Sequence, residues 1–150
     1  MKSSIIPSEG ENTRLLIDTH VLVWLAFGEP MLGPRARKAI KRAALDQQVR
    51  VSAITPWEIA VLVSKGRIDL HQDTLQWTQS ALRLPGVKLT DLSPEIAVAS
   101  TRLPWEMHGD PADRILVATA RHFGATLVTA DRQLLEYARL GYFRGLSASL

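Results

Sequence analysis

The stretch from residue 109 to 131, GDPADRILVATARHFGATLVTAD, constrains the fold of this chain more than any other part of it. Asp110 is a candidate helix N-cap, and Pro111 stands in the first turn, where its missing N–H does no harm. Apolar residues then recur at helical spacing until Gly124, a residue typical of helix ends. Residues 125–130 are apolar and rich in β-branched side chains, which predicts a strand buried on both faces. A helix followed by such a strand indicates a parallel sheet covered by helices.

Strand and helix signals alternate in the same way through the rest of the chain. Strands are predicted at residues 14–18, 49–53, 87–92 and 125–130, with a weak edge strand at 144–149. Helices are predicted at residues 19–27, 33–48, 55–65, 72–84, 93–103 and 131–140, in addition to the helix between Asp110 and Gly124. Alternation with short connections favours a parallel α/β sandwich.

Composition limits the class of protein. A chain of 150 residues, 46% of them apolar, is expected to form one domain with a single sizeable core. The absence of cysteine excludes disulfides and thiolate metal sites, which fits a reducing cytosol, and no apolar run approaches the ~20 residues of a membrane span. A net charge of +3 permits a polyanionic partner without requiring one. We expect a cytoplasmic domain over residues 14–150, after a flexible polar leader at residues 1–13.

Acidic residues stand where predicted strands end or where the following helices begin. They are Asp18, Glu58, Asp113 and Asp131. That edge of an open parallel α/β sheet is where ligands bind. Carboxylates gathered there repel one another, and a divalent cation removes the conflict. Oxygen ligands without cysteine or clustered histidine favour Mg²⁺ or Mn²⁺, and such an ion can activate water for phosphodiester hydrolysis.

Helix capping is the alternative interpretation of these acids. Residues 55–58 and 110–113 both fit capping boxes, and Asp131 is itself a candidate N-cap. Capping explains Asp18 least, because it ends a strand and precedes Thr19, which is a better cap candidate. Since Ser, Thr or Asn would cap equally well, the presence of acids at all these positions favours a shared site.

Several segments of the chain, taken in order, form a recognisable set of motifs. They are LLIDTHVLVWLA, VSAITPWEIA, GRIDL, LPWEMHGDPADRILVATA and LVTAD, and they run from about residue 14 to residue 137. Together they resemble the motifs of PIN-domain ribonucleases, in particular the VapC-type toxins of toxin–antitoxin pairs. The resemblance implies a three-layer α/β/α sandwich with a central parallel sheet, and Mg²⁺- or Mn²⁺-dependent cleavage of RNA. It also implies inhibition by a cognate VapB-like antitoxin, and a homodimer.

The resemblance assigns metal-binding roles to individual acids. Asp18, Glu58 and Asp113 match the three acids that hold the metal, and Asp131 matches a fourth, more variable acidic position. Gly109 departs from the family pattern, in which arginine is common at this place. No acid is lost by this departure, so catalysis is still expected, although the RNA contacts of the loop can differ.

Supporting and substrate-binding roles are assigned to a second group of residues. The candidates for supporting the site are Thr19, Asp110 and Thr129. The candidates for contacting substrate are Arg114, His108, Lys38 and Arg42. A solvated helix face is the simpler interpretation of the basic residues near Lys38, and an ordinary loop histidine is that of His108. Core packing is expected for the tryptophans, although Trp105 lies in a predicted loop and is a candidate to stack on a base.

Other functions fit the sequence less well. An aspartyl-phosphate phosphatase would need an acid two residues after Asp18, where His20 stands. A phospho-receiver domain would need a lysine after a late strand, and none follows Asp131. A catalytically silent PIN-like module that binds RNA or protein would usually lose an acid. All the expected acids are present, which favours an enzyme.

Overall fold

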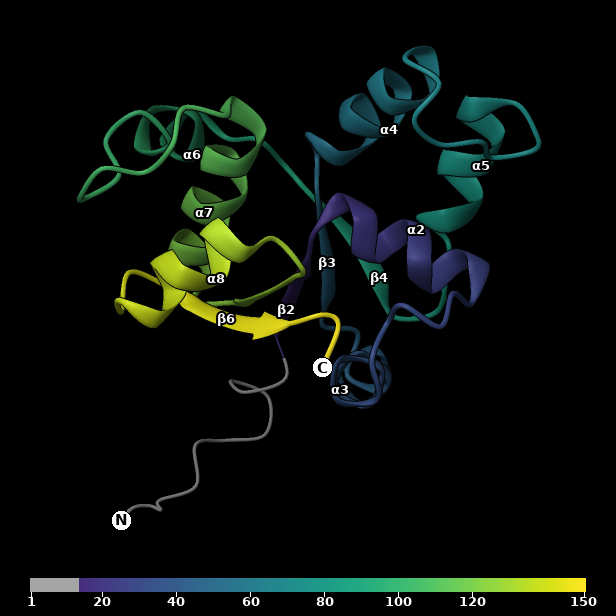
Figure 1. Cartoon of the computed structure of the whole chain (residues 1–150), viewed down its shortest axis with the longest axis horizontal. Helices are drawn as coiled ribbons and strands as arrows, with labels where there is room; N and C mark the ends of the chain where they lie inside the picture. Colours follow the sequence, from purple (N-terminus) through teal and green to yellow (C-terminus); the bar gives the residue numbers. More distant parts are fainter. Residues whose placement is uncertain (1–13) are drawn as a thin grey trace.

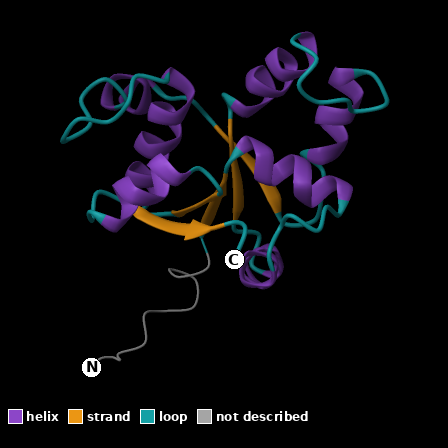
Figure 2. Ribbon diagram, viewed as in Figure 1, coloured by secondary structure: helices purple, strands orange, loops and turns teal. Residues whose placement is uncertain are grey.

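The computed structural model describes residues 14–150, and the predicted leader lies outside the described residues (Figures 1 and 2). The strands are β2 (Leu15–Ile17), β3 (Val49–Ser52), β4 (Val87–Thr90), β5 (Thr126–Thr129) and β6 (Arg144–Ser147). The helices are α2 (Thr19–Phe27), α3 (Pro34–Leu45), α4 (Thr55–Ser64), α5 (Thr74–Ala81), α6 (Pro94–Ala99), α7 (Pro111–Phe123) and α8 (Arg132–Arg139). Within this range no helix has the length and apolarity needed to cross a membrane.

The sheet has five parallel strands in the order β4-β3-β2-β5-β6, with the first described strand at its centre. The chain builds outward from β2 to β3 and β4, and later returns to add β5 and β6 on the other side. Ile17 pairs with Val128, so the residues that follow these two strands emerge side by side. The break in strand order between β2 and β5 therefore creates the crevice where α/β proteins bind ligands.

Side chains of the central strand alternate between two cores, as the pleat of a strand requires. Leu15 and Ile17 pack with α2, α3, α4 and α5, whereas Leu16 packs with α6, α7 and α8. Helices therefore cover both faces of the sheet, as Figure 2 shows. The predicted three-layer α/β/α sandwich is confirmed.

Most predicted elements are present, with shorter helices than the apolar pattern indicated. The helix predicted at 72–84 begins only after Asp73, whose side chain accepts a hydrogen bond from the amide of Gln76. The helix predicted at 33–48 ends at Leu45, and Gln47 then adopts a positive φ of 59°. Capping and a left-handed turn therefore set these boundaries, while the apolar pattern extends past them. The weak edge strand is present as β6.

Candidate functional site

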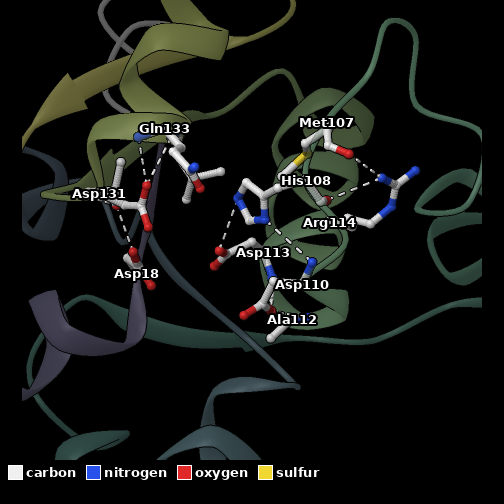
Figure 3. Close-up of polar contacts among 11 residues, drawn as sticks. Asp18, Met107, His108, Asp110, Ala112, Asp113, Arg114, Asp131 and Gln133 are labelled. Atoms are coloured by element: carbon white, nitrogen blue, oxygen red, sulfur yellow. Dashed lines mark hydrogen bonds and ion pairs between the residues drawn. The ribbon is translucent and has the colours of Figure 1, made fainter.

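The four predicted acids lie around the C-terminal edge of the central strands. Asp18 follows β2, Asp131 precedes α8, and Glu58 and Asp113 lie in the first turns of α4 and α7. The charges of Asp18, Asp131 and Glu58 all act on Asp113, which places the four carboxyl groups in one electrostatic neighbourhood. Figure 3 shows Asp18, Asp113 and Asp131, the three aspartates of this set, at the edge of the sheet. The fold thus brings together acids that are far apart in the sequence.

Asp18 is held by two hydrogen bonds at the end of the central strand. Its Oδ1 accepts from the amide of Thr19 at 2.6 Å, and its Oδ2 accepts from the hydroxyl of Thr129 at 2.6 Å. The Thr129 oxygen also accepts from the amide of Asp131 at 3.1 Å, so one threonine links two of the acids. Burial raises the pKa of Asp18, and the hydrogen bonds from Thr129 and Thr19 oppose that rise.

Glu58 reaches across to helix α2. Its Oε1 accepts from the hydroxyl of Thr19 at 2.6 Å, and the Thr19 oxygen lies 3.0 Å from the hydroxyl oxygen of Thr55. Because Thr19 gives its only hydroxyl hydrogen to Glu58, the second contact is donated by Thr55. Burial is the main cause that raises the pKa of Glu58, followed by the charges of Asp18 and Asp110.

Two capping predictions are therefore wrong. The capping box at residues 55–58 does not form, since Ile54 is the N-cap and makes no side-chain capping bond. Thr55 is instead a buried residue of the helix, and its hydroxyl supports Thr19. The cap pattern in the sequence did not predict this supporting role. The N-cap of α2 is Asp18 and not Thr19, whose hydroxyl is used by Glu58.

Asp110 caps helix α7 as predicted, but Asp113 does not return a capping bond. The Oδ1 of Asp110 accepts from the amides of Ala112 and Asp113 at 2.9 and 3.1 Å. Asp131 is likewise confirmed as the N-cap of α8. The amide of Asp110 donates to Nδ1 of His108 at 3.3 Å, which leaves the Asp113 carboxyl group available to the site.

Asp113 faces His108 across the site. Nε2 of His108 lies 3.3 Å from Oδ2 of Asp113, but without the geometry of a hydrogen bond, so the contact is electrostatic. Because Nδ1 of His108 accepts from the amide of Asp110, Nε2 is the ring nitrogen that lies toward Asp113. Burial raises the pKa of Asp113 to about 8, with smaller contributions from Asp110, Asp18 and the other acids.

The acidic site fits a hard divalent cation in its chemistry. Its side-chain donors are carboxylate oxygens, and no lysine or arginine of residues 14–150 forms an ion pair with any of the four acids. Burial and mutual repulsion disfavour the charged forms of Asp18, Glu58 and Asp113. Yet within this range no three acidic or histidine side chains converge as a complete ligand cage.

The predicted substrate contacts fall into two groups. His108 lies at the site, but Arg114 donates to the carbonyl oxygens of Ser100, Met107 and His108, at 2.9, 3.0 and 3.3 Å. Figure 3 shows its side chain extending away from the acids toward Met107. The guanidinium group of Arg114 therefore holds the loop before α7, and its predicted contact with substrate stays a prediction.

Lys38 and Arg42 are not brought to the acids. Both are exposed on α3, which Figure 1 places at the far end of the sheet from α4. Lys38 instead lines a separate cavity with Arg37 and Lys41. Their predicted contact with substrate stays a prediction, for a surface away from the acids.

Fold and site together define a class of protein: a three-layer α/β/α domain with a hydroxyl-supported carboxylate cluster at the edge of its parallel sheet. The family model of the PIN domain matches residues 15–140. The chain therefore belongs to the PIN-domain family, as its motifs indicated.

Individual relatives agree with this assignment. The chain is 36% identical over 125 residues to Ribonuclease VapC22 of Mycobacterium tuberculosis, which covers 83% of this chain and 92% of that protein. A toxin–antitoxin complex from Klebsiella pneumoniae contains a chain of 26% identity and TM-score 0.56, with 86% of this chain and 94% of that one covered. A chain of VapBC2 from Rickettsia felis, solved bound to a promoter DNA fragment, matches with a TM-score of 0.66 at 17% identity. The match covers 89% of this chain and 97% of that one, and it supports the fold. The predicted resemblance to VapC-type proteins is confirmed.

Proposed function

We propose that this chain is a Mg²⁺- or Mn²⁺-dependent endoribonuclease that acts as a toxin and is neutralised by a cognate antitoxin. The observation that carries the proposal is the meeting of Asp18, Glu58, Asp113 and Asp131 at one edge of the sheet. Membership of the PIN-domain family and the name of the relative Ribonuclease VapC22 support RNA as the substrate. A silent binding module would have no need of a cluster in which burial and neighbouring acids raise the pKa of Asp18, Glu58 and Asp113.

These four acids would hold the ion. When bound, it would supply an activated water and stabilise the negative charge that develops on the scissile phosphate. The chain's own groups then have distinct tasks. Thr129 keeps Asp18 in place from β5, and Thr19 keeps Glu58 in place from α2. Asp113 would be a ligand only in its ionised form, and burial raises its pKa to about 8, so ion binding would have to displace its proton.

Antitoxin binding and self-association need surface that the fold leaves uncovered. Trp57 on α4 and Leu75 on α5 are 59% and 64% exposed, although core packing was expected for Trp57. Exposed apolar side chains on neighbouring helices are typical of protein contacts. The Klebsiella relative was solved as a toxin–antitoxin complex, which supports the proposed VapB-like partner. We also propose a homodimer and, because the substrate is RNA, action in the cytoplasm.

The test is cleavage of total RNA by the purified chain with Mn²⁺ or with EDTA, followed by mapping of the cut ends. We expect discrete cuts that require Mn²⁺. Asp18→Asn, purified identically, should show no cleavage, whereas Asp46→Asn, which changes an exposed acid at the end of α3, should cleave normally. Cleavage by Asp18→Asn at the wild-type rate would contradict the proposal.

A further inference from the structure

A groove of about 440 Å³ lies beside the acidic site, between the loop before α7 and helix α8. Its volume is in the range of sites that hold small organic ligands. Its walls include Trp105, Met107, His108, Arg132, Tyr137 and Leu140. His108 also faces Asp113, and Arg132 directly follows Asp131, so the groove is continuous with the proposed catalytic centre.

Trp105 has an unusual conformation in this loop. The residue is 69% exposed, more than any other tryptophan, tyrosine or phenylalanine of the described range, and its φ is +68°. A bulky residue in the left-handed region is strained, and a large apolar ring in water gains little stability from burial. Such strain concentrates at functional sites. Burial in the core therefore does not explain a tryptophan at this position.

The loop that carries Trp105 is held firmly in place. The hydroxyl of Tyr137 donates a hydrogen bond to the carbonyl oxygen of Pro104, and Arg114 binds three further loop carbonyls. The ring of Trp105 stacks on Tyr142 at 6.2 Å, and Tyr142 stacks on Tyr137 at 4.5 Å. The indole ring is thus oriented in advance while most of its surface remains open, which reduces the entropy lost when a planar ligand binds.

Arg132 provides a positive charge on the same groove. It is exposed and has no hydrogen-bond or ion-pair partner within residues 14–150. Two acids, Glu106 and Glu136, also line the groove, and Glu136 is paired with Arg139 at 2.6 Å. An aromatic face, apolar walls and an available guanidinium group match the base and the phosphate of an unpaired nucleotide.

We propose that this groove is a nucleotide subsite, in which a base flanking the scissile phosphate stacks on Trp105 and Arg132 contacts the RNA backbone. The inference rests on the proposed function and defines its substrate as single-stranded RNA. A duplex keeps its bases stacked on one another and cannot offer one to Trp105.

The test measures binding of fluorescein-labelled RNA by fluorescence anisotropy in EDTA, which removes the divalent cation that the proposed cleavage requires. The probes are a single-stranded oligonucleotide, a series of the same oligonucleotide in which each member has one abasic position at a different place, and the duplex of the unmodified oligonucleotide. Trp105→Ala and Trp105→Leu should weaken single-strand binding by about 5- to 100-fold, the usual range for loss of one base–aromatic stack, whereas Trp105→Phe should retain most of it. Phe123→Ala, which removes an exposed aromatic ring at the other end of α7, is the matched control and should bind normally.

The abasic series identifies the stacked base. One abasic position should weaken wild-type binding as much as Trp105→Ala does, and combining the two changes should cause no further loss. Arg132→Gln should weaken binding of all sequences alike and reduce the slope of log affinity against log salt by about one. Equal binding of the duplex, or an affinity that Trp105 does not affect, would overturn the subsite.

Two further outcomes separate this proposal from others. If the protein cleaves RNA in Mn²⁺ but binds RNA equally well with and without Trp105, the subsite is overturned and the proposed nuclease activity is not affected. Trp105-dependent binding without cleavage would contradict the nuclease alone. Unchanged RNA affinity with weaker antitoxin binding by Trp105→Ala would reassign the groove to protein recognition and overturn the subsite.

Discussion

The hydroxyl of Thr19 donates a 2.6 Å hydrogen bond to Glu58, and this bond joins helix α2 to helix α4 at the acidic site. Thr19 is almost fully buried, with 1% of its surface exposed. The bond therefore orients the Glu58 carboxylate from a fixed position in the core, 39 residues away in the sequence.

Removal of this bond should weaken metal binding more than it weakens the fold. Thr19→Val keeps the shape of the side chain but leaves Glu58 without its donor. We expect the Mn²⁺ concentration for half-maximal cleavage to rise by about 10- to 100-fold, as is usual when a residue that orients a ligand is lost. Thr19→Ser keeps the hydroxyl and should behave nearly as the wild type. Equal metal requirements for Thr19→Val and Thr19→Ser would show that the hydroxyl has no orienting role.

Stability without metal should fall as the pH rises from about 4 to about 8. The pKa of Asp113 is raised from 3.8 to about 8, so the folded state binds this proton more tightly than the unfolded chain does. The resulting stabilisation is complete below the unfolded pKa and is lost as the pH rises through the folded pKa. Burial acts in the same direction on Asp18 and Glu58. Urea unfolding in EDTA at pH 5, 7 and 8.5 measures the trend, and Asp113→Asn should flatten it.

Divalent metal should stabilise the wild-type protein and release protons on binding. A ligand present at 100 times its Kd adds about 2.7 kcal/mol to the free energy of unfolding. Mn²⁺ should thus raise Tm in the wild type and fail to do so in Asp18→Asn. Because Asp113 must ionise, calorimetry at pH 7 in buffers of different ionisation enthalpy should detect proton release. A binding heat that does not depend on the buffer would show that metal binding displaces no proton from Asp113.

Arg114 should contribute to both stability and activity through the loop that it holds. Arg114→Gln removes charged donors from three backbone carbonyls, and we expect a loss of about 2 kcal/mol in the free energy of unfolding. RNA cleavage should fall as well, since the loop positions His108 and Trp105. Urea unfolding and cleavage rates measure the two effects. Arg35→Gln, which changes an exposed arginine of α3, is the matched control and should alter neither.

The sequence predicted the architecture well because its local signals agree with the global fold. The buried, β-branched strand at Thr126–Thr129 and the capped helix before it can be predicted from residue types alone. The four acids of the candidate site could be predicted from the sequence for a related reason. Each stands next to a strand end or in a first helical turn, and parallel strands bring such positions to one edge.

Contacts between elements could not be predicted in the same way. The spacing of Thr55 and Glu58 satisfies a capping box, and only the packing of α4 against α2 reveals that Glu58 bonds to Thr19. Arg114 follows Asp113 directly, but successive helical residues do not face the same way, so their side chains have different neighbours. The distance of Lys38 from the acids depends on where the chain places α3, which no local pattern specifies.

The central position of β2 has a consequence for synthesis of the protein on the ribosome. Asp18 emerges early, but the hydroxyl that holds it belongs to Thr129, 111 residues later. A nascent chain that has not reached β5 lacks this hydroxyl, the strand that completes one side of β2, and the acid at position 131. The site as a whole can therefore form only after β5 and Asp131 have been synthesised.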